Sequence, residues 1–346
     1  MDDMADTAPS ARRQNLRWLL RQRSLWIALL LWTLLGLAFM VLCHGPRGAV
    51  PLNLPPNQLK QTPLAQVIGS WLAFIFLVLE CGAVLLLTRP RAWPDLAQRA
   101  PERAIALHET VALWVYAAIV LLAGRWIGFH TFGAGIAMHL NGSLVGATRI
   151  QSPHEVFLWS AYNFTFFALL PYLVFRMRGY SREQLNLRSA NWKNDTLVIL
   201  VVLAVGCLMD LRGPNILQLT PHQRVVGGLL SFVVHLFLTD LPVMIFIYAI
   251  LLPRYARLFS PATTFLLGAA SYPAIHIFET FTRYDSPSDS LISAIFVFLF
   301  FFPPGIMKSF LTMRTGNAWV HMWAFHAISP HVTVDTRLIV HDFKVK

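Results

Sequence analysis

The sequence predicts an all-α, polytopic membrane protein with about eight to nine transmembrane helices. Hydrophobic residues make up 56% of the 346 residues and charged residues only 13%, roughly half the charged share of a typical soluble domain. The apolar residues gather in long runs, and a helix needs about 20 such residues to cross a hydrocarbon core of about 30 Å. Helices are expected because backbone groups in lipid must satisfy one another's hydrogen bonds.

Eight apolar runs and a ninth, shorter one are expected to span the membrane. They lie near 24–43, 64–88, 104–127, 155–177, 195–211, 225–252, 261–281 and 289–312, with the shorter run at about 317–331. The first run is longer than the apolar region of a typical signal peptide, and no small residues mark a cleavage site after it. It is therefore interpreted as a retained anchor.

The chain is expected to divide near residue 178. The predicted parts are a basic cytoplasmic N-terminus at 1–23, a four-span N-terminal half at 24–177, a second membrane core at 178–331 and a tail at 332–346. Within the first half, the Gly- and His-rich segment at 128–154 has an apolar content too broken for a span. This segment predicts a re-entrant or interfacial element on the external side.

The basic residues indicate the orientation of the chain rather than a nucleic-acid partner. The net charge is +11, but the basic residues are spread over the segments between spans and do not form one binding face. Most of them lie in segments that are cytoplasmic when the N-terminus is inside, as the positive-inside rule requires. These are Arg12, Arg13, Arg17, Arg21, Arg23, Arg89, Arg91, Arg99, Arg103, Arg176, Arg178, Arg182, Arg188, Lys193, Arg254, Arg257, Lys308 and Arg314.

Three short motifs in the second half resemble a known family of intramembrane peptidases. The sequence LLPR at 251–254 ends a span, Tyr272 precedes His276 by four residues, and an Arg-Thr-Gly sequence leads to His326. Their order and spacing are similar to those of the CPBP family, the bacterial relatives of the type II CAAX prenyl proteases. The resemblance implies a CPBP-like core at 178–331, a bacterial inner-membrane location among membrane lipid, and a membrane peptide or protein as substrate or partner.

The chain departs from this family where the family carries its catalytic acid. Alignment on the LLPR motif places Val243 and Met244 at the positions of a Glu-Glu pair, and the last motif keeps His326 but has Pro330 in place of Asn or Asp. Peptide hydrolysis needs a base for water and a group that stabilises the oxyanion. The resemblance therefore implies a catalytically degenerate protein that binds or escorts a membrane peptide or protein.

Two other acids leave an active intramembrane peptidase as an alternative. Asp240 lies three and four residues before the two replaced glutamate positions and shares their helical face. Glu279 lies three residues after His276, a spacing that lets a carboxylate and an imidazole reach one ion or water. Asp240, Glu279, His276 and His326 thus form a candidate catalytic cluster. His276, Glu279 and His326 are also candidate ligands for a divalent metal such as zinc.

Ordinary structural pairs would explain the same acids without catalysis. Asp240 can pair with His235, and Glu279 with Arg283, because such pairs are common near helix ends.

A transporter or lipid-handling protein is a further alternative, supported by the buried polar groups. The sequence Pro303-Pro304-Gly305 is expected to break or kink its helix, although no inverted repeat is apparent. His321 and His331 flank His326 by five residues each, which places the three rings on different faces of an α-helix. A single three-histidine site on this segment is therefore not expected.

The charge pattern predicts that residues 89–103 and 178–194 are cytoplasmic and that 128–154 is external. After replacement of the three native cysteines, single cysteines in these segments can be probed with a membrane-impermeant maleimide. Only the 128–154 segment should be labelled in intact cells. Labelling of the 178–194 segment in intact cells would contradict the topology.

Overall fold

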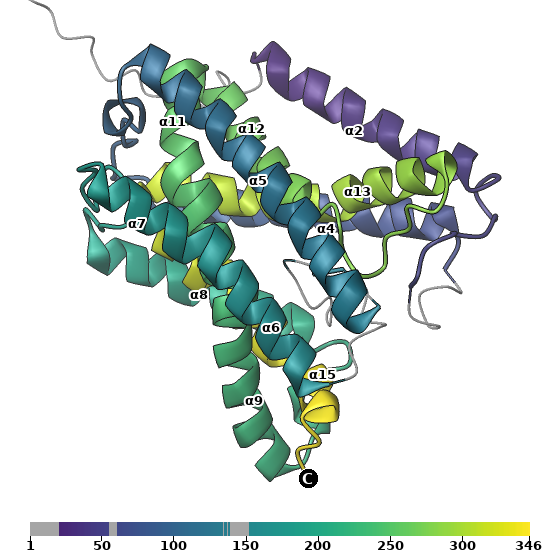
Figure 1. Ribbon diagram of the computed structural model, residues 1–346. Coiled ribbons are helices and arrows are strands. Elements are labelled where there is room, and N and C mark those ends of the chain that lie inside the picture. Colours follow the sequence, from purple (N-terminus) through teal and green to yellow (C-terminus); the bar gives the residue numbers. More distant parts are fainter. Residues whose placement is uncertain (1–20, 55–60, 134, 137, 139–151) are drawn as a thin grey trace, which may run out of the picture.

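The computed structural model describes residues 21–54, 61–133, 135, 136, 138 and 152–346. These residues form helices joined by turns and contain no strand, so the prediction of an all-α, polytopic membrane protein is confirmed (Figure 1). Most of the predicted re-entrant or interfacial segment at 128–154 lies outside the described residues. Its first residues belong to α5, which ends at Phe132 before a left-handed Gly133 with φ 72°.

Seven helical segments of the described chain are long and apolar enough to cross a membrane. They are Arg23–Leu42 (α2), Pro63–Leu87 (α4), Arg103–Phe132 (α5), Pro153–Met177 (α6, η2 and α7), Trp192–Asp210 (α8), Pro221–Leu258 (α9 to α11) and Pro287–Thr315 (α13). The other two expected spans are shorter or irregular. The first is α12 (Pro261–Ile275), and the second contains α14 (Ala318–His321), η6 (Met322–His326) and η7 (Ser329–Val334).

Smaller elements complete the chain. Three segments within the long helical segments are π-helical. They are η2 (Phe164–Leu169), between α6 (Pro153–Asn163) and α7 (Leu170–Met177), η4 (Leu236–Asp240), after α9 (Pro221–His235), and η5 (Met244–Leu251). The same long segment continues through α10 (Leu241–Val243), η5 (Met244–Leu251) and α11 (Leu252–Leu258). Short helices η1 (Ala97–Arg99) and η3 (Ile216–Gln218) lie between spans, and α15 (Thr336–Asp342) is the last.

Five helices begin at a Ser-Pro or Thr-Pro pair. The hydroxyl of the capping residue accepts a hydrogen bond from a backbone N–H of the first turn, and the proline takes the first helical position, where no N–H is needed. The capping residues are Thr62, Ser152, Thr220, Ser260 and Ser286. The start of each of these spans is therefore fixed by local sequence.

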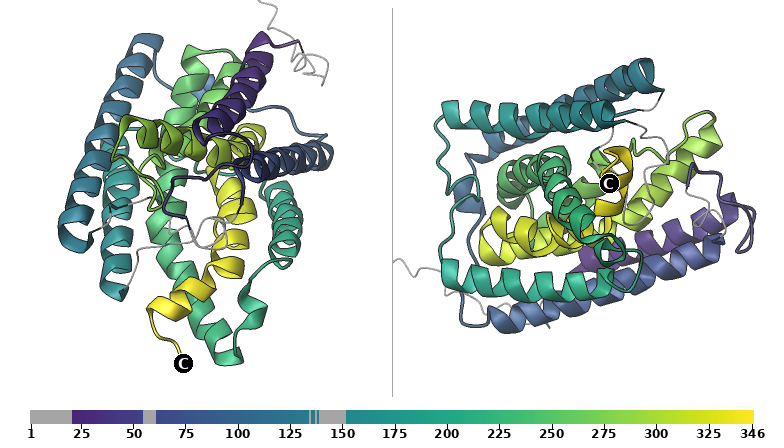
Figure 2. Two further views of the ribbon diagram at one scale, coloured as in Figure 1. Left: turned by 90° about the vertical axis from the view of Figure 1, so that its right-hand side faces the viewer. Right: turned by 90° about the horizontal axis from the view of Figure 1, so that it is seen from below.

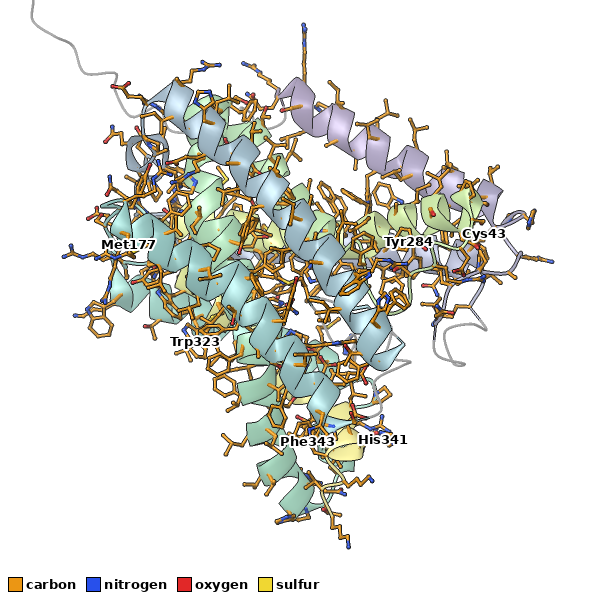
Figure 3. All side chains as sticks on the ribbon, viewed as in Figure 1. Cys43, Met177, Tyr284, Trp323, His341 and Phe343 are labelled. Carbon is orange, nitrogen blue, oxygen red and sulfur yellow. The ribbon has the colours of Figure 1, made fainter. Side chains whose placement is uncertain are left out.

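The segment from Pro221 to Leu258 and helix α13 form the centre of the bundle. They bury 67% and 61% of their most apolar stretch, against 17% for α2, 22% for α4 and 33% for α5. Seen from below in Figure 2, α5 to α7 lie on one side of this centre and α2 and α4 on the other. The outer helices expose apolar side chains, such as Met177 at the end of α7 (Figure 3), as a lipid-facing surface requires.

Helices α12 and α13 pack in close contact at Gly305. A Cβ atom built there would lie 2.2 Å from the carbonyl oxygen of Ala269, a distance that a side chain cannot adopt. Helix α13 continues through Pro303 and Pro304, so the expected break of this helix does not occur. The tight packing holds Tyr272 of α12 and Lys308 of α13 in register, with the Lys308 Nζ atom 3.5 Å from the Tyr272 ring centre.

A buried ion-pair network anchors the LLPR segment. Glu109 of α5 accepts hydrogen bonds from Arg254 Nε at 2.6 Å and from the Tyr180 hydroxyl at 2.8 Å, and it pairs with Arg178 at 2.7 Å. Burial raises the pKa of Tyr180, and its hydrogen bond to Glu109 raises it further. Arg254 is fully buried, and its guanidinium lies 4.2 Å from the ring centre of Phe175. The network therefore joins α5, α7 and α11.

Glu109→Gln should lower the thermal stability of the purified protein in detergent. Removing one partner of a buried pair leaves the Arg254 charge uncompensated, which costs about 3–5 kcal/mol. The matched control is Glu183→Gln, because Glu183 and Arg188 form an exposed pair at 3.9 Å, and such pairs contribute about 1 kcal/mol or less. Equal shifts of the melting temperature in the two variants would show that the Glu109 network does not stabilise the fold.

Candidate functional site

The polar residues of the core lie on irregular helical elements. Asp240 ends the π-helix η4, His326 ends the π-helix η6, and His331 lies in the π-helix η7. A π-helical turn contains more residues than an α-helical turn and is often found at functional sites. The chain therefore departs from regular α-helix where it supplies Asp240, His326 and His331 to this region.

Asp240, His326 and His331 form a compact, buried cluster. The Nδ1 atom of His326 lies 3.3 Å from Asp240 Oδ1, and the Nε2 atom of His331 lies 3.7 Å from the same oxygen. One ligand atom from each residue can be chosen so that the three lie within 4.8 Å of one another. The exposed fractions are 0% for Asp240, 2% for His326 and 0% for His331, so solvent does not screen the cluster.

Asp335 fixes the orientation of His331. The Nδ1–H of His331 donates to Asp335 Oδ2 at 2.8 Å, because a carboxylate oxygen can only accept. In the neutral imidazole, the lone pair then resides on Nε2, which faces Asp240. A carboxylate that holds the distal N–H of a histidine is the usual support for a metal-ligating imidazole.

His235 extends the cluster on the side of Asp335. Its Nδ1–H donates to the carbonyl oxygen of Ser231 at 2.7 Å, and its Nε2 atom lies 3.4 Å from Asp335 Oδ2. The rings of His235 and His331 are stacked at 4.3 Å. His235, His331 and Asp335 thus form a second buried group with metal-ligand spacing, and His331 belongs to both groups.

A cavity of about 620 Å³ reaches the cluster through His326. Tyr272 and Lys308 line the cavity beside His326. The Tyr272 hydroxyl lies 3.4 Å from His326 Nε2, and Lys308 interacts electrostatically with Asp240. One imidazole of the cluster is therefore accessible to a molecule in the cavity, while the other two members lie behind it.

The four residues of the expected catalytic cluster separate into two pairs. Asp240 contacts His326, whereas His276 Nε2 lies 3.9 Å from Glu279 Oε1. Tyr272 lies between the pairs, with its ring centre 4.3 Å from that of His276 and 5.8 Å from that of His326. Both histidines are buried.

The expected helix at 261–281 is wrong in its length. Helix α12 includes Pro273 in its last turn and ends at Ile275, and turns follow. Glu279 therefore reaches His276 through these turns and not from one face of a helix.

The expected structural pairs also differ from the observed ones. Asp240 is adjacent to two histidines of the C-terminal segment, and His235 pairs with Asp335 instead. Arg283 pairs with Asp285 at 3.2 Å and with Asp289 at 3.5 Å. Asp240 thus takes its partners from a distant part of the chain, and so does Asp335 in its pair with His235.

The sequence pattern does not indicate three residues of the site. An α-helix would place His331 and His326 on different faces, but the π-helical turns bring the two ring centres to 5.1 Å. The charge pattern predicts a cytoplasmic position for Lys308, but this residue is 1% exposed inside α13. Asp335 falls in the predicted tail, although its spacing of four residues after His331 is that of a helical pair.

No protein-family model matches this chain, and no curated protein or solved structure shows a significant match to it.

The cluster of Asp240, His326 and His331 has the chemistry of a divalent-metal site. Two imidazoles and one carboxylate are common ligands of zinc at sites that keep a position open for water or substrate. Neither oxygen of Asp240 accepts a hydrogen bond from a described residue, and a buried carboxylate without donors is costly. A cation bound between these three side chains would stabilise it, so the residues fit a metal ion.

Purified protein should bind a divalent metal ion, with zinc as the first probe, in equilibrium dialysis after treatment with a chelator. Asp240→Asn or His331→Ala should remove binding, and Asp335→Asn should weaken it by about 10–100-fold because it supports a ligand without being one. His222→Ala, at an exposed position of α9, is the control. Undiminished binding in the Asp240→Asn and His331→Ala variants would rule out this site.

Proposed function

We propose that this chain is a membrane-embedded, metal-dependent hydrolase that cleaves an amide or ester bond of a membrane-dissolved substrate. The observation that carries the proposal is the convergence of Asp240, His326 and His331 beside the 620 Å³ cavity, whose lining includes His326. This is the active-peptidase alternative raised by the sequence, with His331 added and the pair of His276 and Glu279 set apart from the reacting centre.

Each residue of the cluster has a distinct role in this proposal. Asp240, His326 and His331 would hold the ion, and a bound divalent ion supplies Lewis-acid polarisation and makes water more acidic. Asp335 keeps the lone pair of His331 directed toward Asp240. The Tyr272 hydroxyl, beside His326, is a donor that can stabilise negative charge developing on a substrate oxygen.

Val243 and Met244 occupy the positions of the two glutamates of the CPBP family, so a catalytic acid would have to come from another residue. Val243 and Met244 are fully buried and apolar, so they can neither accept a proton nor bind a hard ion. These two residues favour the second candidate, a catalytically degenerate protein that binds or escorts a membrane peptide or protein. Asp240 precedes them by about one turn and supplies the only acid of the metal cluster, which favours the hydrolase.

The hydrolase proposal can be tested with zinc-loaded protein in lipid nanodiscs. The probes are a quenched-fluorescent transmembrane peptide and a fluorogenic acyl ester. Asp240→Asn keeps the side-chain volume but removes the carboxylate, so hydrolysis should fall by about 10² or more. Glu279→Gln should leave most of the rate, because Glu279 lies with His276 outside the metal cluster.

Two outcomes would contradict the hydrolase. Hydrolysis that survives both Asp240→Asn and His331→Ala would place the active site elsewhere. Binding of the intact peptide by metal-loaded protein, without cleavage of either probe, would favour the binding or escort role.

A further inference from the structure

The cavity beside His326 has largely apolar walls, and its lining includes one lysine, Lys308. Its volume of about 620 Å³ lies within the usual range for small ligands, about 300–1,000 Å³, and is too small for a folded partner. Helices α4 and α13 form two of its walls and are joined by a hydrogen bond from Ser70 Oγ to the Leu299 carbonyl. The apolar lining includes Leu72, Phe76, Leu77, Phe300, Phe301 and Phe325.

Lys308 is an unusual member of this lining. It is 1% exposed, and its Nζ atom lies against the Tyr272 ring, 3.5 Å from the ring centre. The π-face of an aromatic ring attracts a cation, but it accepts no conventional hydrogen bond. Among the described residues, none accepts a hydrogen bond from the ammonium group or forms an ion pair with it within 4 Å. A buried amine in this state gains free energy when an anion arrives, because the anion stabilises its protonated form.

We infer that the cavity binds a membrane amphiphile with a single apolar chain and an anionic head, either a carboxylate or a phosphate. The head pairs with Lys308, and the chain lies against the aromatic and aliphatic walls. Lys308 and His326 both contact Tyr272, so the anionic head lies at the end of the cavity where the metal cluster begins. The inference rests on the proposed function, for which it names the substrate class.

The acids near the cavity restrict where the anionic head can bind. Asp210 lines the cavity, accepts a hydrogen bond from the Ser329 hydroxyl at 2.6 Å and repels the buried Glu80 carboxylate. Among the described residues, the carboxylate that interacts electrostatically with Lys308 is Asp240. A cation held by Asp240 would offset that charge. The head is therefore expected near Lys308 and excluded from the vicinity of Asp210.

Photolabelling in lipid nanodiscs tests the inference without any turnover. A diazirine-bearing fatty acid is crosslinked to the protein in competition with oleate, oleyl phosphate or oleyl alcohol, which share one chain and differ in the head. The two anions should compete at least about tenfold better than the alcohol, as expected for a charge-assisted hydrogen bond in a buried site. The relative strength of the two anions distinguishes a carboxylate head from a phosphate head.

Lys308→Met should reduce competition by the anions to the level of the alcohol and leave the alcohol unchanged. Lys193→Met, at an exposed position at the start of α8, is the matched control. Ala73→Trp fills the cavity from α4 and should weaken competition by all three compounds. Equal competition by alcohol and anions in the parent protein, which requires no variant to fold, would overturn the inference, as would an anion preference that survives Lys308→Met.

The Asp240→Asn variant distinguishes this inference from the hydrolase proposal. It lacks the carboxylate of the metal cluster but keeps Lys308, and it removes the charge that repels an anion. The anion preference should therefore persist in this variant while hydrolysis is lost. Hydrolysis in the parent protein without any anion preference would refute the inference alone, and anion preference without hydrolysis would refute the hydrolase alone.

Discussion

Burial of the Asp240 carboxylate is the constraint on which the centre of this structure depends. Asp240 has no exposed surface and lies between the imidazoles of His326 and His331. In an apolar bundle, a carboxylate must be stabilised by donors, by an opposite charge or by a cation. His326 and His331 lie beside this carboxylate, and Lys308 interacts with it electrostatically. Asp335 orients His331. The centre of the bundle therefore contains a polar cluster within a largely apolar core.

The π-helical segments allow Asp240, His326 and His331 to meet. In a regular α-helix, residues five positions apart point in clearly different directions, and His326 and His331 could not meet. The wider turns of η6 and η7 bring their ring centres to 5.1 Å. The π-helix η4 ends at Asp240, which places the acid opposite these rings. The same departures from α-helix also weaken the local hydrogen-bond geometry, so the surrounding packing must stabilise them.

The rigid contacts around the cluster supply that packing. Gly305 allows the backbones of α12 and α13 to approach, and this approach places Lys308 against Tyr272. At the far end of the chain, α15 is held to α6 by an edge-on contact between Phe343 and Phe157 at 5.3 Å (Figure 3). Phe343 lies close in sequence to Asp335, which orients His331. The buried cluster of Asp240, His326 and His331 thus depends on contacts well outside the residues that form it.

The sequence by itself determined the membrane spans and where several of them begin, because these features are local. A run of about 20 apolar residues is sufficient to predict a span, and a Ser-Pro or Thr-Pro pair is sufficient to begin a helix. The sequence also singled out Asp240 and His326, since an acid or an imidazole in a span is costly unless it has a partner. Only the tertiary structure decided which residues are partners. His331 joined the cluster through π-helical geometry, Asp335 through the fold of the last helix, and Lys308 through the packing of α12 on α13. His276 and Glu279 were separated from Asp240 and His326 because α12 ends at Ile275 and Tyr272 lies between the two pairs. The contacts of Asp240 with His326 and His331 join segments far apart in the sequence, and no local pattern encodes them; the pair of His331 and Asp335 is local, with a spacing of four residues.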